Sequence, residues 1–412
     1  MFHGHKNAEE SPGLPWLNPD ANVSSEDLTD TLGPDSDDDL GVDNAIEEAE
    51  SRAVGAPETV EESKTVLVTG AAGFIGSHVA YILLNRGDKV VVLDEVNDYY
   101  DPAIKQQNLR LLKQQNEAGA GSLKFYHGDC CDAQLLERIW QDEGITHVVH
   151  LAARAGVRPS IEDPFVYLHS NIEATTRLME VARKYDCKHF VFASSSSVYG
   201  GSSKDTFSEE DVVNKPVSPY AATKAACELL AHTWHTLYGL QVAGLRFFTV
   251  YGPRGRPDMA PFKFIHRVFR GQTIQQFGDG TSSRDYTYID DIAAGVVRAL
   301  DRPRGYQIYN LGNGNPVRLR DFIQMVGSAT GKRPVIEQLP DQPGDVPRTC
   351  ADISKARRML GYVPAVTFKE GLERTAAWYS TFYLNPVADD ERNDKDDVLR
   401  WAVNAEELVQ CR

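Results

Sequence analysis

The sequence holds few cysteines, fewer basic than acidic residues, and no long hydrophobic run. Its six cysteines among 412 residues show no Cys-x-x-Cys spacing, which indicates reduced thiols and predicts a cytoplasmic location. No stretch approaches the ~18 continuous apolar residues that cross a bilayer, so we expect no membrane-spanning helix. A hydrophobic content of 42% is ordinary for a globular chain, and the length predicts two or three domains.

The negative charge is concentrated at the N-terminal end. Of the net charge of −16, residues 1–63 carry −15, from 17 acidic and two basic residues, which leaves −1 for the rest. This near-neutral remainder predicts no affinity for nucleic acid or an anionic membrane. We expect residues 1–63 to be a disordered acidic extension, either merely solvating or an interaction and localisation arm. The segment lacks the features of a signal or transit peptide.

The two ends of the chain carry little further chemistry. Residues 386–412 turn acidic again, and we expect them to be loose. His3 and His5 stand in the acidic extension, and we predict no metal site.

Strand-like apolar runs alternate with amphipathic stretches over residues 64–252. This alternation predicts an α/β protein with a Rossmann-type, doubly wound parallel sheet, whose ligands lie beyond the carboxyl ends of the strands. The expected strands are Val66–Thr69, Lys89–Leu93, Leu123–His127, His147–Leu151, Phe190–Ala193 and Gln241–Arg246. The expected helices are Ile75–Asn85, Ala133–Asp142, Ile172–Tyr185 and Pro219–Tyr238.

The pattern loosens after Gly252, where several prolines interrupt the chain. We expect residues 253–385 to form a smaller mixed α/β domain for the substrate, with some segments of the C-terminal half returning to the first domain. The expected helices of this part are Ile289–Leu300, Leu319–Ala329 and Phe368–Thr381.

Three glycines spaced three apart follow the first strand and open the first helix. Gly70 allows a sharp turn, Gly73 lets a ligand approach the backbone, and Gly76 lets the helix pack closely. The free N–H groups and the positive dipole of the helix start suit a pyrophosphate. The spacing in this strand-turn-helix context predicts a dinucleotide site.

Residues at the ends of the next strands extend this site. Asp94 ends the second strand, where a carboxylate accepts hydrogen bonds from a ribose 2′-hydroxyl and repels a 2′-phosphate, which favours NAD over NADP. Asp129 follows Gly128 at the end of the third strand and suits the adenine edge, although a plain turn explains this Gly-Asp pair nearly as well. The candidate cofactor residues are Gly70, Gly73, Phe74, Ile75, Gly76, Asp94, Asp129, Cys130, Leu151, Ala152, Ala153, Tyr220 and Lys224.

A second motif carries acid-base chemistry. Tyr220 and Lys224 are four residues apart on an expected helix and therefore share a face. A neighbouring ammonium favours the phenolate and lowers the phenol's pKa from about 10 toward neutrality. The serines at the end of the fifth strand supply hydroxyls that can relay a proton or hold a reacting hydroxyl. Arg256, Arg284 and Arg348 are candidate anion clamps because a guanidinium matches diphosphate or carboxylate with two hydrogen bonds.

Taken together, these motifs resemble the extended short-chain dehydrogenase/reductase family of nucleotide-sugar epimerases and dehydratases over residues 64–383. The likeness is greatest to its UDP-glucuronate 4-epimerase branch. The supporting strings are Val68-Thr-Gly-Ala-Ala-Gly-Phe-Ile-Gly-Ser-His78, Asn97-Asp-Tyr-Tyr-Asp-Pro102, Ala193-Ser-Ser-Ser-Ser-Val-Tyr-Gly200, Leu245-Arg-Phe-Phe-Thr-Val-Tyr-Gly-Pro253, Gly255-Arg-Pro-Asp-Met-Ala260, Asp285-Tyr-Thr-Tyr-Ile-Asp-Asp291 and Gln342-Pro-Gly-Asp-Val-Pro347.

The resemblance implies a role for each matching residue. It implies that Tyr220 is the proton acceptor with Lys224 as its partner, that residues 64–252 bind NAD, and that residues 253–385 bind a UDP-sugar. It further implies a homodimer through the helices near Ile172–Tyr185 and Pro219–Tyr238. The implied catalytic residues are Tyr220, Lys224, Ser195 and Ser197. The implied substrate residues are Ser195, Ser196, Ser197, Thr249, Arg256, Arg284 and Asp345.

The serine run separates this chain from relatives with other chemistry. Related decarboxylases carry Glu at position 197, and dehydratases carry an Asp-Glu pair at positions 196 and 197, whereas both are serine here. The resemblance therefore implies C4 epimerisation of UDP-glucuronate through a 4-keto intermediate. UDP-glucose 4-epimerase, UDP-glucuronate decarboxylase and a non-catalytic dinucleotide-binding scaffold stay open. Arg154, Pro159 and Arg254 depart from the branch and leave the sugar itself open.

Overall fold

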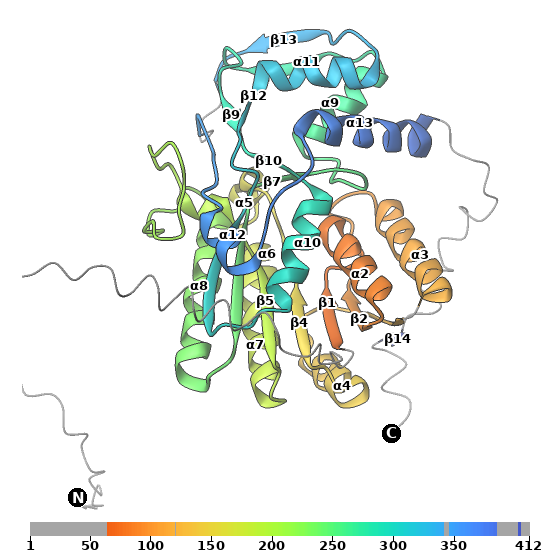
Figure 1. Ribbon diagram of the computed structural model, residues 1–412, viewed down its shortest axis with the longest axis vertical. Coiled ribbons are helices and arrows are strands. Elements are labelled where there is room, and N and C mark those ends of the chain that lie inside the picture. The colour runs from red at the N-terminus through yellow and green to blue at the C-terminus, as the bar shows by residue number, and fades with distance from the viewer. Residues whose placement is uncertain (1–63, 120, 342–345, 385–402, 405–412) are drawn as a thin grey trace, which may run out of the picture. The chain divides into compact units, whose positions relative to one another are not determined.

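A parallel sheet flanked by helices carries most of the chain in the computed structural model (Figure 1). The structure describes residues 64–119, 121–341, 346–384 and 403–404. The expectations for residues 1–63, for most of residues 386–412 and for Asp345 lie outside the described residues.

The central sheet has eight strands, all parallel, in the order β11-β6-β5-β4-β1-β2-β3-β14. The order reverses between β1 and β4, which is where such sheets bind ligands. All six expected strands are present, so the prediction of a Rossmann-type doubly wound sheet is confirmed. The bounds are β1 Thr65–Thr69, β2 Lys89–Asp94, β3 Ser122–His127, β4 His147–His150, β5 His189–Ser195, β6 Val242–Phe247, β11 Tyr306–Leu311 and β14 Val403–Asn404.

Helices cover both faces of this sheet because alternate strand residues point to opposite sides. Val66 and Val68 of β1 belong to one buried cluster, which includes side chains of α2 and α10. Leu67 belongs to a second cluster with side chains of α4, α7 and α8. The bounds of these helices and their neighbours are α2 Phe74–Arg86, α3 Pro102–Ala118, α4 Ala133–Glu143, α5 Val157–Glu162, α6 Pro164–Tyr167, α7 Ala174–Lys184, α8 Pro219–Tyr238 and α10 Ile289–Leu300.

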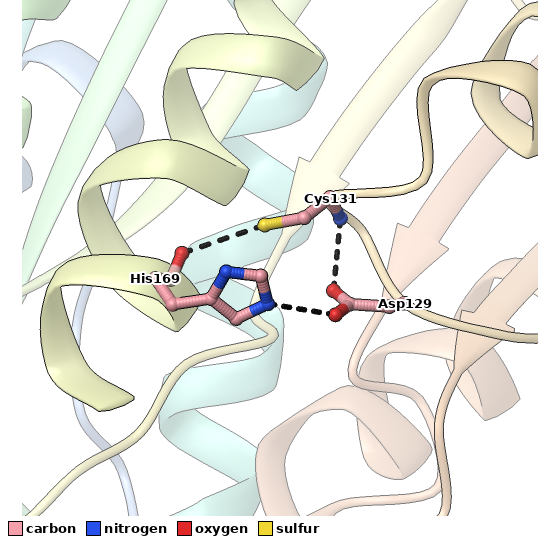
Figure 2. A group of neighbouring side chains, drawn as sticks. All are labelled: Asp129, Cys131 and His169. Carbon is pink, nitrogen blue, oxygen red and sulfur yellow. Dashed lines mark hydrogen bonds and ion pairs between the residues drawn. The ribbon is translucent and has the colours of Figure 1, made fainter. Parts of the chain in front are cut away.

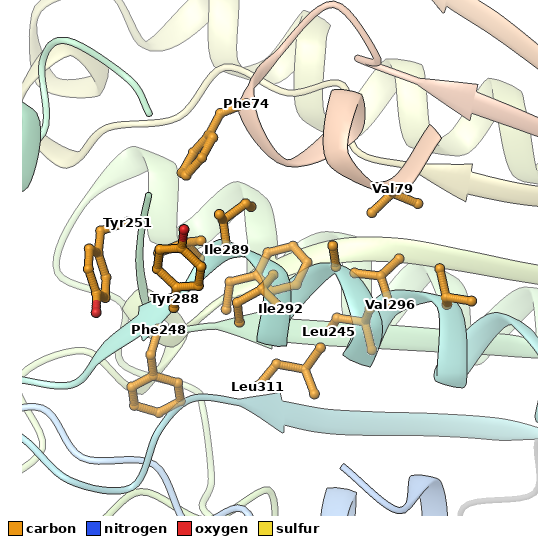
Figure 3. Packing of buried hydrophobic residues seen from close by; sticks show 14 of the residues in the cluster. Phe74, Val79, Leu245, Phe248, Tyr251, Tyr288, Ile289, Ile292, Val296 and Leu311 are labelled. Atoms are coloured by element: carbon orange, nitrogen blue, oxygen red, sulfur yellow. The ribbon is translucent and has the colours of Figure 1, made fainter. Parts of the chain in front are cut away.

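The C-terminal half contributes to the nucleotide-binding sheet. Helix α10, Ile289–Leu300, which the sequence analysis placed with the smaller part, packs against α2, β4, β5 and β6 of the sheet domain. Ile292 and Val296 of α10 belong to the same buried cluster as Val79 of α2 and Leu245 of β6 (Figure 3). Strand β11, which the sequence did not predict, pairs with β6 and extends the sheet. The continuous apolar face of α10 is buried here because it fills the space beside α2.

The remaining elements form short two-stranded sheets and helices beyond the strand ends. The strand pairs are β7–β10, β8–β13 and β9–β12, and the helices of this part include α9, α11 and α13. The domain boundary at Gly252 stays a prediction. The bounds are β7 Thr249–Tyr251, β8 Ile274–Phe277, β9 Ser283–Arg284, β10 Tyr286–Tyr288, β12 Val317–Arg318, β13 Ile336–Leu339, α9 Ala260–Phe269, α11 Leu319–Thr330, α12 Ser354–Leu360 and α13 Phe368–Tyr379.

The predicted helices agree with the structure except at one start. The helix expected from Ile172 begins instead as a wider π-helical turn, Leu168–Glu173, which continues into α7. The sequence reading did not identify α3 or α9. In the described part of the chain, no helix combines the length and apolar character needed to cross a membrane.

Candidate active site

A cavity of about 410 Å³ opens at the carboxyl ends of the strands, on both sides of the β1/β4 switch point. Its wall includes residues at the ends of β1, β2, β3, β4, β5 and β6. The predicted site residues that line it are Gly70, Gly73, Phe74, Ile75, Gly76, Asp94, Asp129, Cys130, Leu151, Ala152, Ala153, Ser195, Ser196, Ser197, Tyr220, Lys224, Thr249 and Arg256.

The glycine turn has no room for side chains. Gly70 has a φ of +72°, and a Cβ there would lie 2.6 Å from the backbone nitrogen of Ala152. A Cβ on Gly76 would lie 2.2 Å from the Gly70 carbonyl oxygen. Gly73 caps α2 without any side-chain hydrogen bond to the first turn. The helix therefore presents backbone N–H groups to the cavity, as a pyrophosphate requires.

Asp94 connects the end of β2 to the glycine turn. Its Oδ2 accepts a hydrogen bond from Ala72 N at 3.0 Å, and its Oδ1 accepts one from Val96 N at 2.8 Å. Burial raises the pKa of Asp94, although Lys105 and these N–H groups oppose the shift. The carboxylate is thus anchored at the strand end that the sequence predicts to meet a ribose.

Ser195, Tyr220 and Lys224 meet inside the cavity. The Ser195 hydroxyl interacts with the Tyr220 phenol and lowers its pKa. The same hydroxyl accepts a hydrogen bond from Ser197 N at 3.1 Å. Lys224 Nζ donates to the Ala193 carbonyl at 2.8 Å, which ties α8 to β5. Both Ser195 and Lys224 are buried. The arrangement aims one phenol, one hydroxyl and one ammonium at the same enclosed space.

The electrostatics of Tyr220 differ from the expectation. Burial raises the pKa of Tyr220, against the lowering effect of Ser195 and Arg256, and Lys224 is not among the groups that shift it. Burial likewise lowers the pKa of Lys224. Desolvation dominates the pKa of both groups, since Lys224 is buried and Tyr220 is half-buried in the cavity wall. The sequence analysis expected Lys224 to lower the pKa of Tyr220. In the structure, Ser195 and Arg256 are the groups that lower it.

Hydrogen bonds hold the start of α8, and two of the residues that make them, Ser160 and Asn171, were not identified from the sequence. Ser218 caps the helix, and Ser160 of α5 accepts a hydrogen bond from Tyr220 N at 3.1 Å. Buried Asn171 accepts a hydrogen bond from Arg154 N and donates to Thr223, one turn of α8 from Tyr220. Only tertiary contact reveals Ser160 and Asn171, because they lie 60 and 52 residues from their partners in α8.

Two arginines surround Tyr99 at one side of the cavity. The guanidinium carbons of Arg154 and Arg256 lie 5.3 and 5.4 Å from the Tyr99 ring centre. Asp258 receives two hydrogen bonds from Arg256, whereas no described carboxylate forms an ion pair with Arg154. Arg154 Nε is buried and has no hydrogen-bond partner among the described residues. This side of the cavity therefore carries uncompensated positive charge.

Other positions singled out in the sequence lie outside the cavity wall. Arg284 donates to the carbonyl of Ser283, and Arg348 donates to that of Asp205. Arg254 adopts a φ of +63°, and burial lowers its pKa to about 10 against the opposing effect of Asp290. Of the departures from the family pattern, Arg154 alone lines the cavity, while Pro159 and Arg254 do not.

Asp129 has a partner that the sequence did not suggest. Its Oδ2 lies 2.8 Å from His169 Nε2, and its Oδ1 accepts a hydrogen bond from Cys131 N at 2.8 Å (Figure 2). Burial raises the pKa of Asp129, but the hydrogen bonds from Cys131 and His169 outweigh it, so the net shift is downward. Burial and the nearby Asp129 carboxylate raise the pKa of the Cys131 thiol to about 12.

The fold and the cavity define a Rossmann-type protein with a serine-tyrosine-lysine cluster facing a dinucleotide site. Residues 67–375 match the family model described as GDP-mannose 4,6 dehydratase. The chain belongs to this family, within the extended short-chain dehydrogenase/reductases, as the sequence resemblance implied.

Named relatives span nearly the same region. The chain is 46% identical over 313 residues to UDP-glucuronate 4-epimerase of Thermodesulfobacterium geofontis, covering 76% of this chain and 95% of that protein. It is 43% identical to UDP-glucuronate 4-epimerase 4 of Arabidopsis thaliana, covering 77% and 76%. UDP-glucuronic acid 4-epimerase from Bacillus cereus, solved with UDP-glucuronic acid and NAD, superposes with a TM-score of 0.71 at 37% identity, covering 77% and 99%.

Proposed function

We propose that this chain interconverts UDP-glucuronate and UDP-galacturonate by NAD-dependent inversion at C4 of the sugar. The observation that carries the proposal is one cavity containing both the Ser195–Tyr220 pair and the cationic surroundings of Tyr99. The first can move a proton on a sugar hydroxyl, and the second suits a sugar carboxylate. The named relatives are UDP-glucuronate 4-epimerases, which agrees with this assignment.

NAD is the cofactor, and the glycine turn fits it. A backbone that excludes any Cβ at Gly70 and Gly76, followed by a helix start without a side-chain cap, suits a pyrophosphate. Asp94 is proposed to meet the ribose of the adenosine part, and Asp129 is proposed to meet its adenine edge through Oδ1, which leaves Oδ2 free for other partners. When bound, NAD supplies hydride chemistry at C4 by accepting a hydride and then returning it.

The residues of the chain are proposed to handle the proton and the orientation of the sugar. Tyr220 takes the proton from the C4 hydroxyl as that carbon is oxidised, and Ser195 holds the same oxygen through its hydroxyl. The 4-keto sugar turns over in the cavity and presents its other face. Tyr220 then returns the proton to the C4 oxygen on reduction. Lys224 keeps α8 against β5 through Ala193.

Retention of the sugar carboxylate follows from the groups around it. Ser196 and Ser197 line the cavity where related decarboxylases and dehydratases carry acids, so neither position has a carboxyl to protonate an enolate or expel water. Thr249, Arg256 and Arg154 are proposed to hold the carboxylate, and a carboxylate held this way keeps its C–C bond out of line with the ketone. Arg284 and Asp345 are proposed to bind the diphosphate and ribose of UDP.

Product analysis tests the reaction directly. Purified protein is incubated with UDP-glucuronate and, separately, with UDP-glucose, and the products are separated by chromatography. UDP-galacturonate is the expected main product of the first reaction. A UDP-pentose as main product would identify a decarboxylase, and faster turnover of UDP-glucose would identify the other epimerase. Absence of turnover with both would favour the non-catalytic scaffold.

Replacing the phenol tests the proton acceptor. We expect Tyr220→Phe to lower kcat by at least about 10²-fold, the usual scale of general acid-base help, with NAD still bound. The matched control is Tyr167→Phe, because that ring lies 6.2 Å from the Tyr220 ring and its hydroxyl donates to the Ala155 carbonyl. Near-normal turnover of Tyr220→Phe would refute the assignment.

We also propose that the protein is a homodimer in the cytoplasm. Leu229, Leu237 and Tyr238 of α8 are exposed, which suits a helix that pairs with a second copy. The five cysteines within the described residues are all unpaired, as a reducing compartment permits. Light scattering of the purified protein distinguishes dimer from monomer.

A further inference from the structure

A second cluster of reactive side chains lies at the rim of the cavity, outside the serine-tyrosine-lysine cluster. Asp129 and Cys131 come from the loop after β3, and His169 comes from the π-helical turn before α7 (Figure 2). One carboxylate oxygen, the thiol sulfur and one imidazole nitrogen all lie within 4.8 Å of one another. Asp129 and His169 keep 43% and 46% of their side-chain surface exposed, so a small ion can reach them.

These three side chains form a ligand set for zinc. Zn²⁺ binds thiolate at about 2.3 Å and imidazole or carboxylate at about 2.0–2.2 Å, in tetrahedral geometry. Ligand atoms around such an ion are about 3.3–3.8 Å apart by that geometry. The ligand atoms lie within 4.8 Å of one another, so the separations would have to close by at most roughly 1.5 Å. The 2.8 Å contact between Asp129 Oδ2 and His169 Nε2 would have to open slightly.

The surrounding hydrogen bonds orient the set as metal sites usually do. Glu173 Oε2 lies 3.1 Å from His169 Nδ1, and Arg177 Nη2 holds the other oxygen of Glu173 at 2.7 Å. A histidine held by a carboxylate at Nδ1 directs Nε2 toward the metal. Cys131 N donates to Asp129 Oδ1, which leaves Oδ2 toward the cluster.

We propose that Asp129, Cys131 and His169 bind a zinc ion at the rim of the cofactor cavity. The ion joins the β3 loop to the π-helical turn, and its fourth position is open to water or another ligand. On binding, the Cys131 thiol releases its proton to the solvent and the sulfur bonds the metal. The sequence analysis predicted no metal site. Cys131 and His169 are 38 residues apart and show no recognisable spacing.

Cobalt titration of the purified, NAD-loaded protein tests this site, since Co²⁺ reports thiolate ligation by a charge-transfer absorption. We expect one Co²⁺ per chain with that absorption, displaced by Zn²⁺. Cys131→Ser and His169→Ala should each abolish it. His232→Ala is the matched control, an exposed helical histidine that should leave the absorption unchanged.

Thermal unfolding of the same variants distinguishes zinc binding at this site from zinc binding by other side chains of the protein. Zn²⁺ should raise the unfolding temperature of the parent protein and of His232→Ala, but not that of Cys131→Ser. Absorption that persists in Cys131→Ser, or no thiolate absorption in the parent protein, would overturn the proposal. Both readouts are independent of epimerase activity, so a wrong function would not affect them.

Discussion

At the scale of single residues, two polar side chains oppose the effect of burial on the pKa of Tyr220. Burial raises the pKa of Tyr220, and the groups that oppose it are the Ser195 hydroxyl and the Arg256 guanidinium. Arg256 itself is neutralised by Asp258 at 2.7 Å. Removing the Ser195 hydroxyl changes no charge, so this neighbour is the better one for testing what sets the pKa of Tyr220.

Ser195→Ala is expected to move the activity profile toward higher pH. Without the hydroxyl, burial raises the pKa of Tyr220 further, so the phenolate forms at higher pH. The loss of one hydrogen bond to a charged group predicts about a tenfold lower kcat/KM near neutral pH. The measurement is kcat/KM against pH. Ser196→Ala is the control, and an unchanged inflection in Ser195→Ala would contradict the prediction.

Arg154→Gln is expected to weaken discrimination for the carboxylate. Arg154 lines the cavity with a buried, unpartnered Nε, so its charge is available to an anionic sugar. We predict about a tenfold loss of kcat/KM with UDP-glucuronate, from one charge-assisted hydrogen bond, and little change with UDP-glucose. Arg158→Gln, an exposed position four residues on, serves as the control. Equal losses with both sugars would argue against contact with the carboxylate.

At the scale of elements, α8 carries Tyr220 and Lys224, the proposed catalytic groups, and is held in place from several sides. Glu228 of α8 and Arg246 of β6 form a buried ion pair at 2.7 Å, with 5% and 4% of their side-chain surfaces exposed. Ser194 of the cavity wall donates to the same Glu228 at 2.5 Å, and Arg246 also donates to Tyr199. The position of Tyr220 therefore depends on a network beneath the cavity floor.

Glu228→Gln is expected to be strongly destabilising because it leaves the Arg246 charge buried without a counter-charge. Removing one partner of such a pair costs about 3–5 kcal/mol of unfolding free energy. Urea unfolding measures the loss. Asp142→Asn breaks the exposed Arg138 pair and should cost at most about 1 kcal/mol. Comparable midpoints for the two variants would show that the buried pair contributes little.

At the scale of the whole molecule, the sheet buries histidines that must stay neutral. His150 of β4 lies between the hydroxyls of Thr69 and Thr175, and burial with the nearby Lys224 charge lowers its pKa to about 3. Burial and Lys64 lower the pKa of His147 to about 4. These histidines link the stability of the sheet to pH.

The free energy of unfolding is expected to fall as the pH drops below about 6.5. The unfolded chain protonates His147 and His150 near that ordinary pKa of histidine, whereas the folded chain does so only near pH 3 to 4. In that window the unfolded state binds more protons, so each histidine costs about 1.4 kcal/mol per pH unit. Urea unfolding between about pH 7 and pH 5 measures the slope. His150→Gln should reduce the slope and His232→Gln, an exposed control, should not; equal slopes would contradict this account.

The sequence by itself determined the elements whose signals are local. The glycine turn is set by backbone conformation at Gly70, the strands of the sheet by apolar runs, and the shared face of Tyr220 and Lys224 by helical periodicity. Each of these depends on residues close together in the chain, so their spacing is readable before folding. These signals were enough to predict the Rossmann-type sheet and the cavity at its strand ends.

Only the tertiary structure decided which distant groups meet. The joining of α10 and β11 to the sheet, the two arginines around Tyr99, and the approach of His169 to Asp129 have no local signal. They arise because packing brings together segments tens of residues apart, and burial then sets their charges and pKa values. The acid-base electrostatics of Tyr220 likewise follow from its surroundings, since the same tyrosine and lysine on an exposed helix would titrate near their ordinary values.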